Sequence, residues 1–207
     1  PRSLLKKVEE TLKVSVIEGY GLTETSPVIA VNTFKDGSVL GSVGPIVPNV
    51  EVKIIDELGE KKVLGEVGEI LVRGETVMQG YWNLPKETAE TITFDGWLKT
   101  GDLGHLDQNN RLFISAGRKK DLIIRAGENV SPLAIENTLI NHPAILEAAV
   151  VGVPDERTGE RVKAYVVLRQ QTSATGSELK SYCRKNLPAF MTPDDFQFMK
   201  ELPKTAT

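Results

Sequence analysis

Gly117-Arg118-Lys119-Lys120-Asp121 is a short polar stretch between two apolar segments, and the character of the chain changes across it. Residues 1–117 carry 12 Lys and Arg against 17 Asp and Glu, a net charge of −5, whereas residues 118–207 carry 13 against 11, a net charge of +2. On composition alone such a stretch is a solvated turn, and the alternative is that the mildly basic second half serves an anionic ligand. A length of 207 residues allows one large domain or two small ones. Because the secondary-structure pattern also changes here, we predict two units, residues 1–117 and residues 118–207.

The segments before the junction contain more strands than helices. Ser3–Leu12 has apolar residues at helical spacing, which predicts a short amphipathic helix, and Val14–Ile17 predicts a buried strand. That strand leads into Glu18–Pro27, a loop rich in glycine and hydroxyl side chains. Residues 42–117 show short alternating or Gly-bounded apolar runs, so we expect a compact, mostly β unit there.

The segments after the junction alternate helices with strands. Ser131-Pro132 places a capping side chain before a proline at the first helical position, which predicts a helix to about Asn141. Ser177 can cap a second helix, which Pro188 ends. Three strands are predicted beside these helices, at Val150–Val153, Val162–Leu168 and Phe196–Met199. A unit of about 90 residues with this pattern is large enough for its own core.

Composition excludes several classes of protein. The chain is 40% hydrophobic and 26% charged, which is ordinary for a globular protein and excludes collagen-like or wholly disordered chains. No apolar run approaches the roughly 20 residues that span a bilayer. The net charge of −3 argues against binding nucleic acid through phosphate neutralisation. The single cysteine, Cys183, excludes an internal disulfide, fits a reducing compartment and is expected to be partly buried in a helix. His105 and His142 have no catalytic pattern around them.

Two polar stretches are candidates for chemistry. The first stretch is Tyr20-Gly21-Leu22-Thr23-Glu24. Tyr20 offers a flat ring for a base, Thr23 offers a hydroxyl for a phosphate oxygen, and Glu24 offers a hard oxygen ligand for Mg²⁺. The stretch follows a predicted strand, where open α/β sheets place their ligands. The alternative is a turn with one exposed carboxylate. In Trp97–Asp102, Asp102 either caps backbone N–H groups after a Thr-Gly turn or accepts both hydroxyls of a ribose.

Together with other segments, these stretches resemble the adenylate-forming superfamily, which comprises the acyl-CoA synthetases and their relatives. The resemblance lies in order along nearly the whole chain, at Tyr20–Glu24, Gly68–Gly74 with Gly80-Tyr81, Trp97–Asp102, Gly117-Arg118 through Gly127 to Glu136, and Leu202–Thr207. It implies the end of a large α/β adenylation domain with a β-rich, barrel-like subdomain, followed by a small, mobile α/β lid domain.

The resemblance also implies a nucleotide site. Tyr20 would stack on adenine, Thr23 would contact the α-phosphate, and Asp102 would bind the ribose hydroxyls. Arg118 would contact ribose and phosphate, and Ile114 would pack near the nucleoside. The loop glycines of the same site are Gly19 and Gly21.

Three further roles follow from the resemblance. Glu24 would hold Mg²⁺ and act in catalysis with Thr23 and Arg118. Lys120 occupies the hinge position at which the lid would pivot between an adenylating and a thioester-forming pose. Gly127 would line the channel for the pantetheine arm of coenzyme A, where a side chain would obstruct the arm.

The implied activity is the ATP-dependent, AMP-forming ligation of a carboxylic acid to coenzyme A. The expected acid is a medium- or long-chain fatty acid. In this reaction the acyl carboxylate attacks the α-phosphate, so cations and oriented donors matter more than a protein nucleophile. One alternative is a ligase that loads the phosphopantetheine of a carrier protein. Another is a non-catalytic module that binds nucleotide or another partner.

Two expected parts of such an enzyme lie outside the sequence. The family's phosphate loop with its lysine belongs upstream of Tyr20, and its adenylation lysine belongs two positions after Thr207. We therefore expect the 207-residue chain alone to be inactive. For the intact enzyme we expect ATP or AMP, Mg²⁺, the acid and coenzyme A as ligands, no nucleic acid and no transmembrane segment. The expected location is cytoplasmic; peripheral membrane association and a homodimer are left open.

Overall fold

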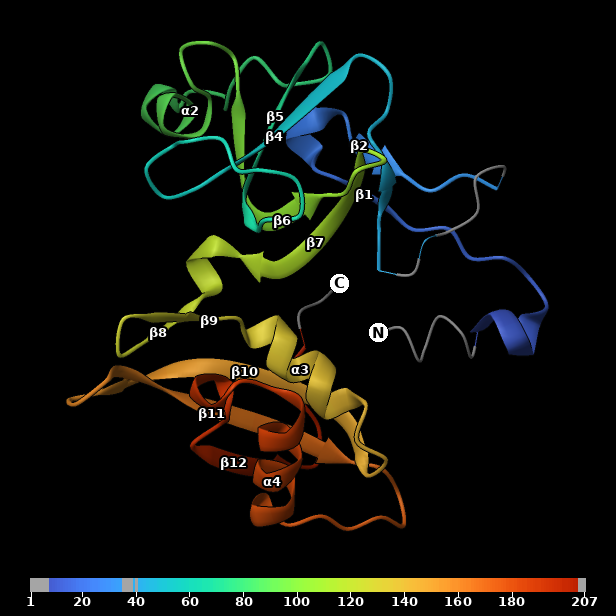
Figure 1. Cartoon of the computed structure of the whole chain (residues 1–207), viewed down its shortest axis with the longest axis vertical. Helices are drawn as coiled ribbons and strands as arrows, with labels where there is room; N and C mark the ends of the chain where they lie inside the picture. Colours follow the sequence, from blue (N-terminus) through green and yellow to red (C-terminus); the bar gives the residue numbers. More distant parts are fainter. Residues whose placement is uncertain (1–7, 35–38, 40, 205–207) are drawn as a thin grey trace. The chain divides into compact units, whose positions relative to one another are not determined.

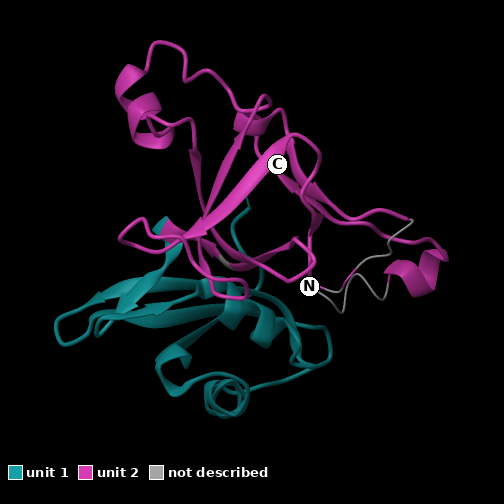
Figure 2. Ribbon diagram, turned by 45° about the horizontal axis from the view of Figure 1, so that its top comes forward, with its two compact units in different colours: residues 1, 120–207 teal, residues 2–119 magenta. Residues whose placement is uncertain are grey.

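A computed structural model describes residues 8–34, 39 and 41–204 of the chain (Figure 1). The chain divides into two compact units, Arg2–Lys119 and Lys120–Thr207, coloured magenta and teal in Figure 2. We call them the N-terminal unit and the C-terminal unit. Both contain strands with a few short helices, so the α/β prediction is confirmed. In the described residues, no helix is long and apolar enough to cross a membrane.

The N-terminal unit is built on an antiparallel sheet of five strands with the order β3-β7-β6-β5-β4. The sheet is open, because within the described residues its end strands β3 and β4 do not pair with each other. A separate antiparallel pair, β1 with β2, and the short helix α2 complete the unit. The bounds are β1 Gly19–Gly21, β2 Val28–Val31, β3 Gly44–Pro45, β4 Val50–Ile55, β5 Gly68–Gly74, α2 Pro85–Thr91, β6 Leu98–Leu106 and β7 Arg111–Arg118.

Alternation along β6 determines which side chains reach the core of this unit. Leu98, Thr100, Asp102, Gly104 and Leu106 are buried or largely so, and the residues between them are less buried. A period of two is what a strand with one buried face requires. The buried cluster on that face includes side chains from β2, β4, β5 and β7. A carboxylate therefore lies among apolar side chains, which marks this part of β6 as the place to look for a site.

Two predictions for the start of the chain differ from the structure. Val14–Ile17 is not a strand: it pairs with no strand in the part of the chain that the structure describes, and Val14 is 50% exposed. The physical reason is that an apolar run becomes a buried strand only where a partner strand covers it, and β1 takes β2 as its partner instead. Of the predicted helix Ser3–Leu12, residues 8–12 are helical, and residues 3–7 lie outside the described residues.

The C-terminal unit is a second five-stranded sheet, with the path β10-β11-β8-β9 and with β12 parallel to β11. Helices α3 and α4 contact each other; α3 packs on β10, and α4 contacts β12. The core formed by sheet and helices includes Ile135 of α3, Leu179 of α4 and Val166 of β11. The bounds are β8 Ile123–Arg125, β9 Glu128–Val130, α3 Pro132–Ile140, β10 Ile145–Asp155, β11 Gly159–Leu168, α4 Gly176–Asn186 and β12 Asp195–Met199.

The helix caps of this unit show what local sequence could and could not predict. Ser131 caps α3 as expected, and its side chain accepts a hydrogen bond from the Ala134 N–H. The cap of α4 is Thr175 rather than the predicted Ser177, because Thr175 forms a reciprocal capping box with Glu178. The short strands β8 and β9, which follow the junction directly, were not predicted.

Candidate functional site

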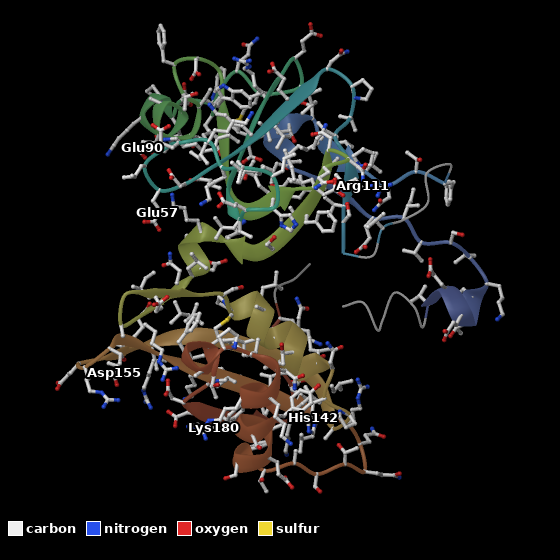
Figure 3. All side chains as sticks on the ribbon, viewed as in Figure 1. Glu57, Glu90, Arg111, His142, Asp155 and Lys180 are labelled. Atoms are coloured by element: carbon white, nitrogen blue, oxygen red, sulfur yellow. The ribbon has the colours of Figure 1, made fainter. Side chains whose placement is uncertain are left out.

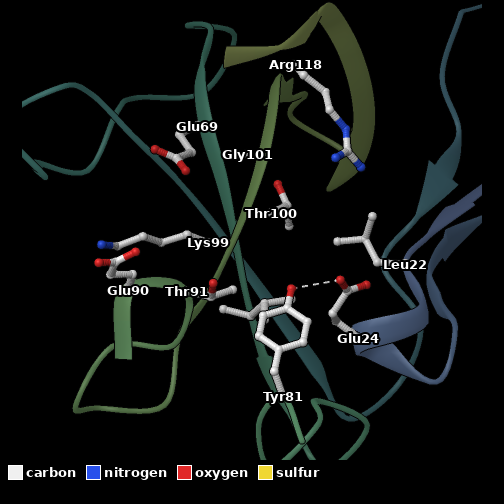
Figure 4. A pocket seen from close by; sticks show the side chains of 11 residues that line it. Leu22, Glu24, Glu69, Tyr81, Glu90, Thr91, Lys99, Thr100, Gly101 and Arg118 are labelled. Atoms are coloured by element: carbon white, nitrogen blue, oxygen red, sulfur yellow. Dashed lines mark hydrogen bonds between the residues drawn. The ribbon is translucent and has the colours of Figure 1, made fainter. Parts of the chain in front are cut away.

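A cavity of about 320 Å³ lies in the N-terminal unit, where the loop after β1, the segment around α2 and strands β5 to β7 meet (Figure 4). Its lining is mainly polar and carries both signs of charge. Among the lining residues are Glu24, Glu69, Tyr81, Lys99, Thr100 and Arg118. A concave surface with converging charged groups is the usual form of a site for a charged small molecule.

The loop Glu18–Pro27 has a shape fixed by its own hydrogen bonds. The fully buried Thr25 hydroxyl accepts from the Leu22 N–H at 3.1 Å and lies 2.8 Å from the Pro27 carbonyl oxygen. A Cβ on Gly21 would lie 1.7 Å from that same carbonyl oxygen, so only glycine fits this close approach. The short 3₁₀ turn Thr23–Thr25 follows and places Glu24 in the cavity lining.

Asp102 is the polar centre of the site. One of its carboxylate oxygens accepts from the Tyr20 hydroxyl at 2.5 Å, and the other lies 3.3 Å from Nε of Arg118. Asp102 and Arg118 are directly opposite each other in the β6–β7 ladder, and the Asp102 side chain is only 10% exposed. Burial, reinforced by the neighbouring Asp102 carboxylate, raises the pKa of Tyr20. The Tyr20 hydroxyl therefore stays protonated and donates to Asp102 at neutral pH.

A second tyrosine, Tyr81, forms a hydrogen bond with the candidate metal ligand, Glu24. The Tyr81 hydroxyl donates to Oε1 of Glu24 at 2.9 Å, the bond drawn as a dashed line in Figure 4. Burial and the Glu24 carboxylate together raise the pKa of Tyr81, so this hydroxyl also remains a donor. The Met78 N–H donates to the Glu24 carbonyl at 2.8 Å and fixes the backbone of the same residue.

The donor set around Glu24 fits magnesium that is shared with phosphates. The described residues contain no group of three or more His, Cys, Asp or Glu side chains that could hold a metal alone. Mg²⁺ in phosphate-handling sites commonly takes one or two carboxylates and completes its coordination with phosphate oxygens and water. The Glu24 carboxylate, oriented by Tyr81 in the lining of the cavity, is consistent with that arrangement.

Cations near the same cavity suit an anionic ligand. Arg118 and Lys99 line it directly. Lys119 forms an ion pair of 2.9 Å with Glu69, another lining residue, whose side chain is 11% exposed. Arg118 is only partly engaged by Asp102, because its side chain is 49% exposed and a guanidinium has five N–H donors.

The structure brings some of the predicted site residues together and separates others. Glu24 and Arg118 line the cavity. Asp102 accepts a hydrogen bond from Tyr20 and forms an ion pair with Arg118, but neither Tyr20 nor Asp102 is itself a lining residue. Gly19 and Gly21 flank Tyr20 on β1. Thr23 is exposed on the turn beside Glu24, whereas Ile114 packs against the core cluster and is not part of the lining.

The remaining two predicted residues, Lys120 and Gly127, belong to the C-terminal unit. Lys120 lies in a 3₁₀ turn, Lys119–Asp121, at the division between the units. Gly127 lies in the turn between β8 and β9 with a φ of +85°, and a Cβ built on it would meet nothing within 4 Å. Its backbone conformation alone therefore favours glycine.

Sequence reasoning missed several residues of the lining. Tyr81 was noted only as part of a family stretch, and its bond to Glu24 joins residues 57 positions apart. Glu69 and Lys99 occupy neighbouring strands, and their convergence depends on the β5–β6 register. A local motif carries no signal for such contacts.

The other candidate side chains lie elsewhere. His105 stacks on Phe113 and shares a hydrogen bond of 2.8 Å with Ser115 on the sheet of the N-terminal unit. His142, labelled in Figure 3, packs edge-on against Tyr182 in the C-terminal unit. Cys183 is fully buried, and burial raises the pKa of its thiol to about 11. None of these side chains lines the cavity.

Comparison with known families places these features in context. Residues 1–82 match the model described as AMP-binding enzyme, and residues 134–207 match the model described as AMP-binding enzyme C-terminal domain. The chain belongs to the AMP-binding, adenylate-forming superfamily. The resemblance inferred from the sequence motifs is thereby confirmed.

Individual relatives extend the match. The long-chain-fatty-acid–CoA ligase of Bacillus subtilis (strain 168) is 44% identical over 207 residues, which is 100% of this chain and 37% of the relative. The sulfoacetate–CoA ligase of Cupriavidus necator is 41% identical over 95% of this chain and 38% of its own length. The chain thus spans less than half the length of these curated relatives.

Solved structures of the superfamily share the fold. ATP-bound MatB from Rhodopseudomonas palustris superposes with a TM-score of 0.93 at 33% identity, over 99% of this chain and 41% of that one. O-succinylbenzoate coenzyme A synthetase from Bacillus subtilis, in complex with AMP, gives a TM-score of 0.85 at 36% identity, over 100% and 41%.

Proposed function

We propose that this chain is the part of an ATP-dependent, AMP-forming carboxylic acid–CoA ligase that contributes the ribose- and metal-binding side of the active site and the lid. The observation that carries the proposal is the Tyr20–Asp102–Arg118 group beside a cavity that Glu24 also lines. An acceptor for ribose hydroxyls, a cation for phosphate and a carboxylate for a metal are the groups that a nucleotide requires. The ATP and AMP complexes of the superfamily structures support this choice of ligand.

The proposed nucleotide contacts follow the chemistry of each side chain. Asp102 accepts from the ribose hydroxyls with lone pairs left by Tyr20 and Arg118, because a carboxylate offers about four acceptor positions. Arg118 donates its remaining N–H groups to ribose and phosphate. The exposed Thr23 hydroxyl donates to the α-phosphate. Tyr20 borders adenine, with Gly19 and Gly21 allowing close approach, and Ile114 supports the nucleoside from the core.

In the first half-reaction, an acyl carboxylate oxygen attacks the α-phosphorus of ATP, a P–O bond forms, and the bond to pyrophosphate breaks. Negative charge grows on the phosphate oxygens, and Arg118 and Thr23 stabilise it there through oriented donors. Magnesium bound at Glu24 would supply further charge neutralisation. Tyr81 holds the Glu24 carboxylate in one orientation for this purpose.

In the second half-reaction, the thiol of coenzyme A attacks the acyl carbon of the adenylate and AMP leaves. We assign residues 118–207 to the mobile lid of this step, with Lys120 as the hinge and Gly127 against the pantetheine arm. The glycine conformation at Gly127 and the division of the chain at Lys120 are consistent with these roles.

For the acid we propose a medium- or long-chain fatty acid. Its support is the long-chain-fatty-acid–CoA ligase from Bacillus subtilis at 44% identity. The sulfoacetate–CoA ligase at 41% identity makes a small anionic acid the second candidate. A carrier-protein thiol in place of free coenzyme A is the alternative acceptor, and a non-catalytic nucleotide-binding module is the alternative of a different class.

The test uses a full-length ligase that carries residues 1–207. Pyrophosphate exchange into ATP is measured with fatty acids of increasing chain length and with sulfoacetate, followed by thioester formation with coenzyme A or a carrier protein. Glu24→Gln should reduce exchange by about 10²-fold or more, since it removes the charge of the metal ligand. Glu66→Gln, a change in an exposed ion pair of the same unit, is the control. The absence of acid-dependent exchange, with AMP binding retained, would favour the non-catalytic module.

A further inference from the structure

The turn between β8 and β9 has a conformation that its own sequence does not fully favour. Its two residues, Ala126 and Gly127, both have positive φ, +51° and +85°. Two-residue hairpin turns with both φ values positive prefer Asn, Asp or Gly at each position. Alanine is not favoured in that region, so the turn depends on contacts from outside the hairpin.

Strand pairing gives little of that support. The hairpin joins the rest of its sheet through a single residue pair, Gly159 of β11 with Arg125 of β8. Hydrogen bonds that reach it include those from the Ala126 N–H to the Thr158 carbonyl and from the Ile124 N–H to the Glu160 carboxylate, both 2.7 Å. Ile123 of β8 and Val130 of β9 are buried in the core of the unit, whereas residues 126–129 are exposed. Apolar packing therefore holds the base of the hairpin and not its turn.

The Arg125 side chain supplies a polar anchor directly beside the turn. One guanidinium nitrogen donates to the carbonyl oxygens of Phe190 and Thr192 at 2.9 and 3.0 Å, and the other donates to the Asp194 carboxylate at 2.5 Å. The Arg125 side chain is only 20% exposed. A planar fork that reaches three acceptors at once fixes both position and direction, which a lysine ammonium does not do.

The acceptors of Arg125 belong to a rigid segment. The second carboxylate oxygen of Asp194 accepts from the Val162 N–H at 3.0 Å, and the Asp194 N–H donates to the Val162 carbonyl at 2.8 Å. Lys180 of α4, labelled in Figure 3, donates to the Asp194 carbonyl at 3.2 Å. The segment before β12 is therefore tied to β11 and α4, and Arg125 ties the turn to that segment.

We propose that Arg125 is a positioning residue that holds the Ala126-Gly127 turn in the shape required for transfer of the acyl group to the thiol. The second part of this statement rests on the proposed function, in which Gly127 borders the pantetheine arm. The first part concerns the C-terminal unit alone and is independent of any activity.

The first experiment measures hydrogen exchange at the Ile124 and Ala126 amides in the 207-residue chain. Arg125→Gln should accelerate exchange there by about tenfold or more, because it removes hydrogen bonds made by a charged group. Arg125→Lys, which keeps the charge but not the fork, should give an intermediate value. The control is Arg161→Gln, which removes another Arg–Asp ion pair of the same unit, between β11 and β12, and should leave both amides unchanged. Exchange in Arg125→Gln that matches this control would overturn the proposal.

The second experiment measures both half-reactions in a full-length ligase that carries residues 1–207. Arg125→Gln should lower the ratio of thioester formation to adenylate formation by about tenfold, with a higher KM for the thiol, since small displacements of a positioning group cost rate. Arg161→Gln should leave the ratio unchanged, and Arg125→Lys should recover part of it. A loss shared equally by the two steps would contradict the positioning role. If the unmodified protein forms neither product, the proposed function fails, and the exchange result still decides whether Arg125 anchors the turn.

Discussion

The Asp102 carboxylate joins two residues from distant parts of the sequence: the Tyr20 hydroxyl donates to one oxygen at 2.5 Å, and Nε of Arg118 lies 3.3 Å from the other. Tyr20 belongs to β1 and Arg118 ends β7, so one side chain of β6 connects the loop motif to the end of the sheet. A buried carboxylate that both partners satisfy is an oriented acceptor, with no need to rearrange before it meets a ribose.

Asp102→Asn should weaken nucleotide binding with little effect on folding. The amide keeps an acceptor for Tyr20 but loses the charge that orients Arg118. We expect AMP to bind about tenfold or more weakly to a full-length ligase carrying this chain, because hydrogen bonds to charged groups contribute about 1.5–3 kcal/mol. The free energy of unfolding should fall by no more than about 1 kcal/mol, since Arg118 is half exposed. Titration calorimetry with AMP measures the first effect, and urea denaturation measures the second.

Asp195→Asn is the matched control, because Asp195 also pairs with an arginine, Arg161, but belongs to the C-terminal unit and has no contact with Tyr20 or Arg118 among the contacts of the described residues. An equal loss of AMP affinity in the two variants would remove Asp102 from the nucleotide site.

Tyr20 should make the free energy of unfolding of the chain depend on pH in the alkaline range. Burial and the Asp102 carboxylate raise its pKa above the usual value of 10 in the folded state. Below pH 10 both folded and unfolded chains keep the proton, so the contribution is constant. Above pH 10 the unfolded state loses the proton first, and the free energy of unfolding falls as the pH rises. Tyr20→Phe should remove this part of the decrease, which begins near pH 10, and urea denaturation between about pH 9.5 and pH 11.5 measures it.

Other groups also titrate in this range, including Cys183. The decisive quantity is therefore the difference in the free energy of unfolding between the unmodified chain and Tyr20→Phe at each pH. Absorbance at 295 nm gives an independent check. If the absorbance change that Tyr20→Phe removes has the pKa of a free tyrosine, about 10, the burial of the Tyr20 hydroxyl is contradicted.

Local sequence was sufficient to predict a feature where that feature depends on residues close together in the chain. The Ser131 cap, the α/β alternation after the junction and the loop around Glu24 all follow from short-range patterns. It failed for Val14–Ile17, because the burial of a strand depends on a partner that the pattern does not contain. The contacts of Tyr81 with Glu24 and of Arg125 with Asp194 span 57 and 69 positions, and only the folded chain brings them together.

The Cys183 thiol should be unreactive in the folded chain. It is fully buried in the core of the C-terminal unit, and burial raises its pKa to about 11, so at pH 8 almost no thiolate is present or accessible. A disulfide reagent should therefore label it only as fast as the unit opens, and urea should accelerate labelling.

An exposed thiol on the same helix provides the comparison. Ser181 is exposed on α4, so Ser181→Cys combined with Cys183→Ala should be labelled at the rate of a free thiol under the same conditions. Labelling of unmodified Cys183 at that same rate, without urea, would show that the core around it is open.

Variants of Gly127 distinguish two explanations for a glycine in the β8–β9 turn: the backbone conformation of the turn and the proposed pantetheine channel. Its φ of +85° means that Ala or Leu strains the backbone by about 1–3 kcal/mol, whereas Asn tolerates the left-handed region. A Cβ there meets nothing within 4 Å of its own unit, so a side chain causes no local clash. We expect Gly127→Asn to keep the free energy of unfolding within about 1 kcal/mol of the unmodified chain. In a full-length ligase it should still lower thioester formation much more than adenylate formation, because the added side chain meets the thiol arm.

Gly127→Leu adds strain to the same obstruction, so it should lose both stability and thioester formation. Pyrophosphate exchange, thioester formation and urea denaturation on the Asn and Leu variants give the three quantities needed. If Gly127→Asn retains full thioester formation while Gly127→Leu loses stability and both half-reactions together, the glycine serves only the turn. In that case the channel role is wrong. A selective loss of thioester formation in Gly127→Asn cannot come from backbone strain, since asparagine adopts this φ. Such a loss would place the turn beside the thiol arm.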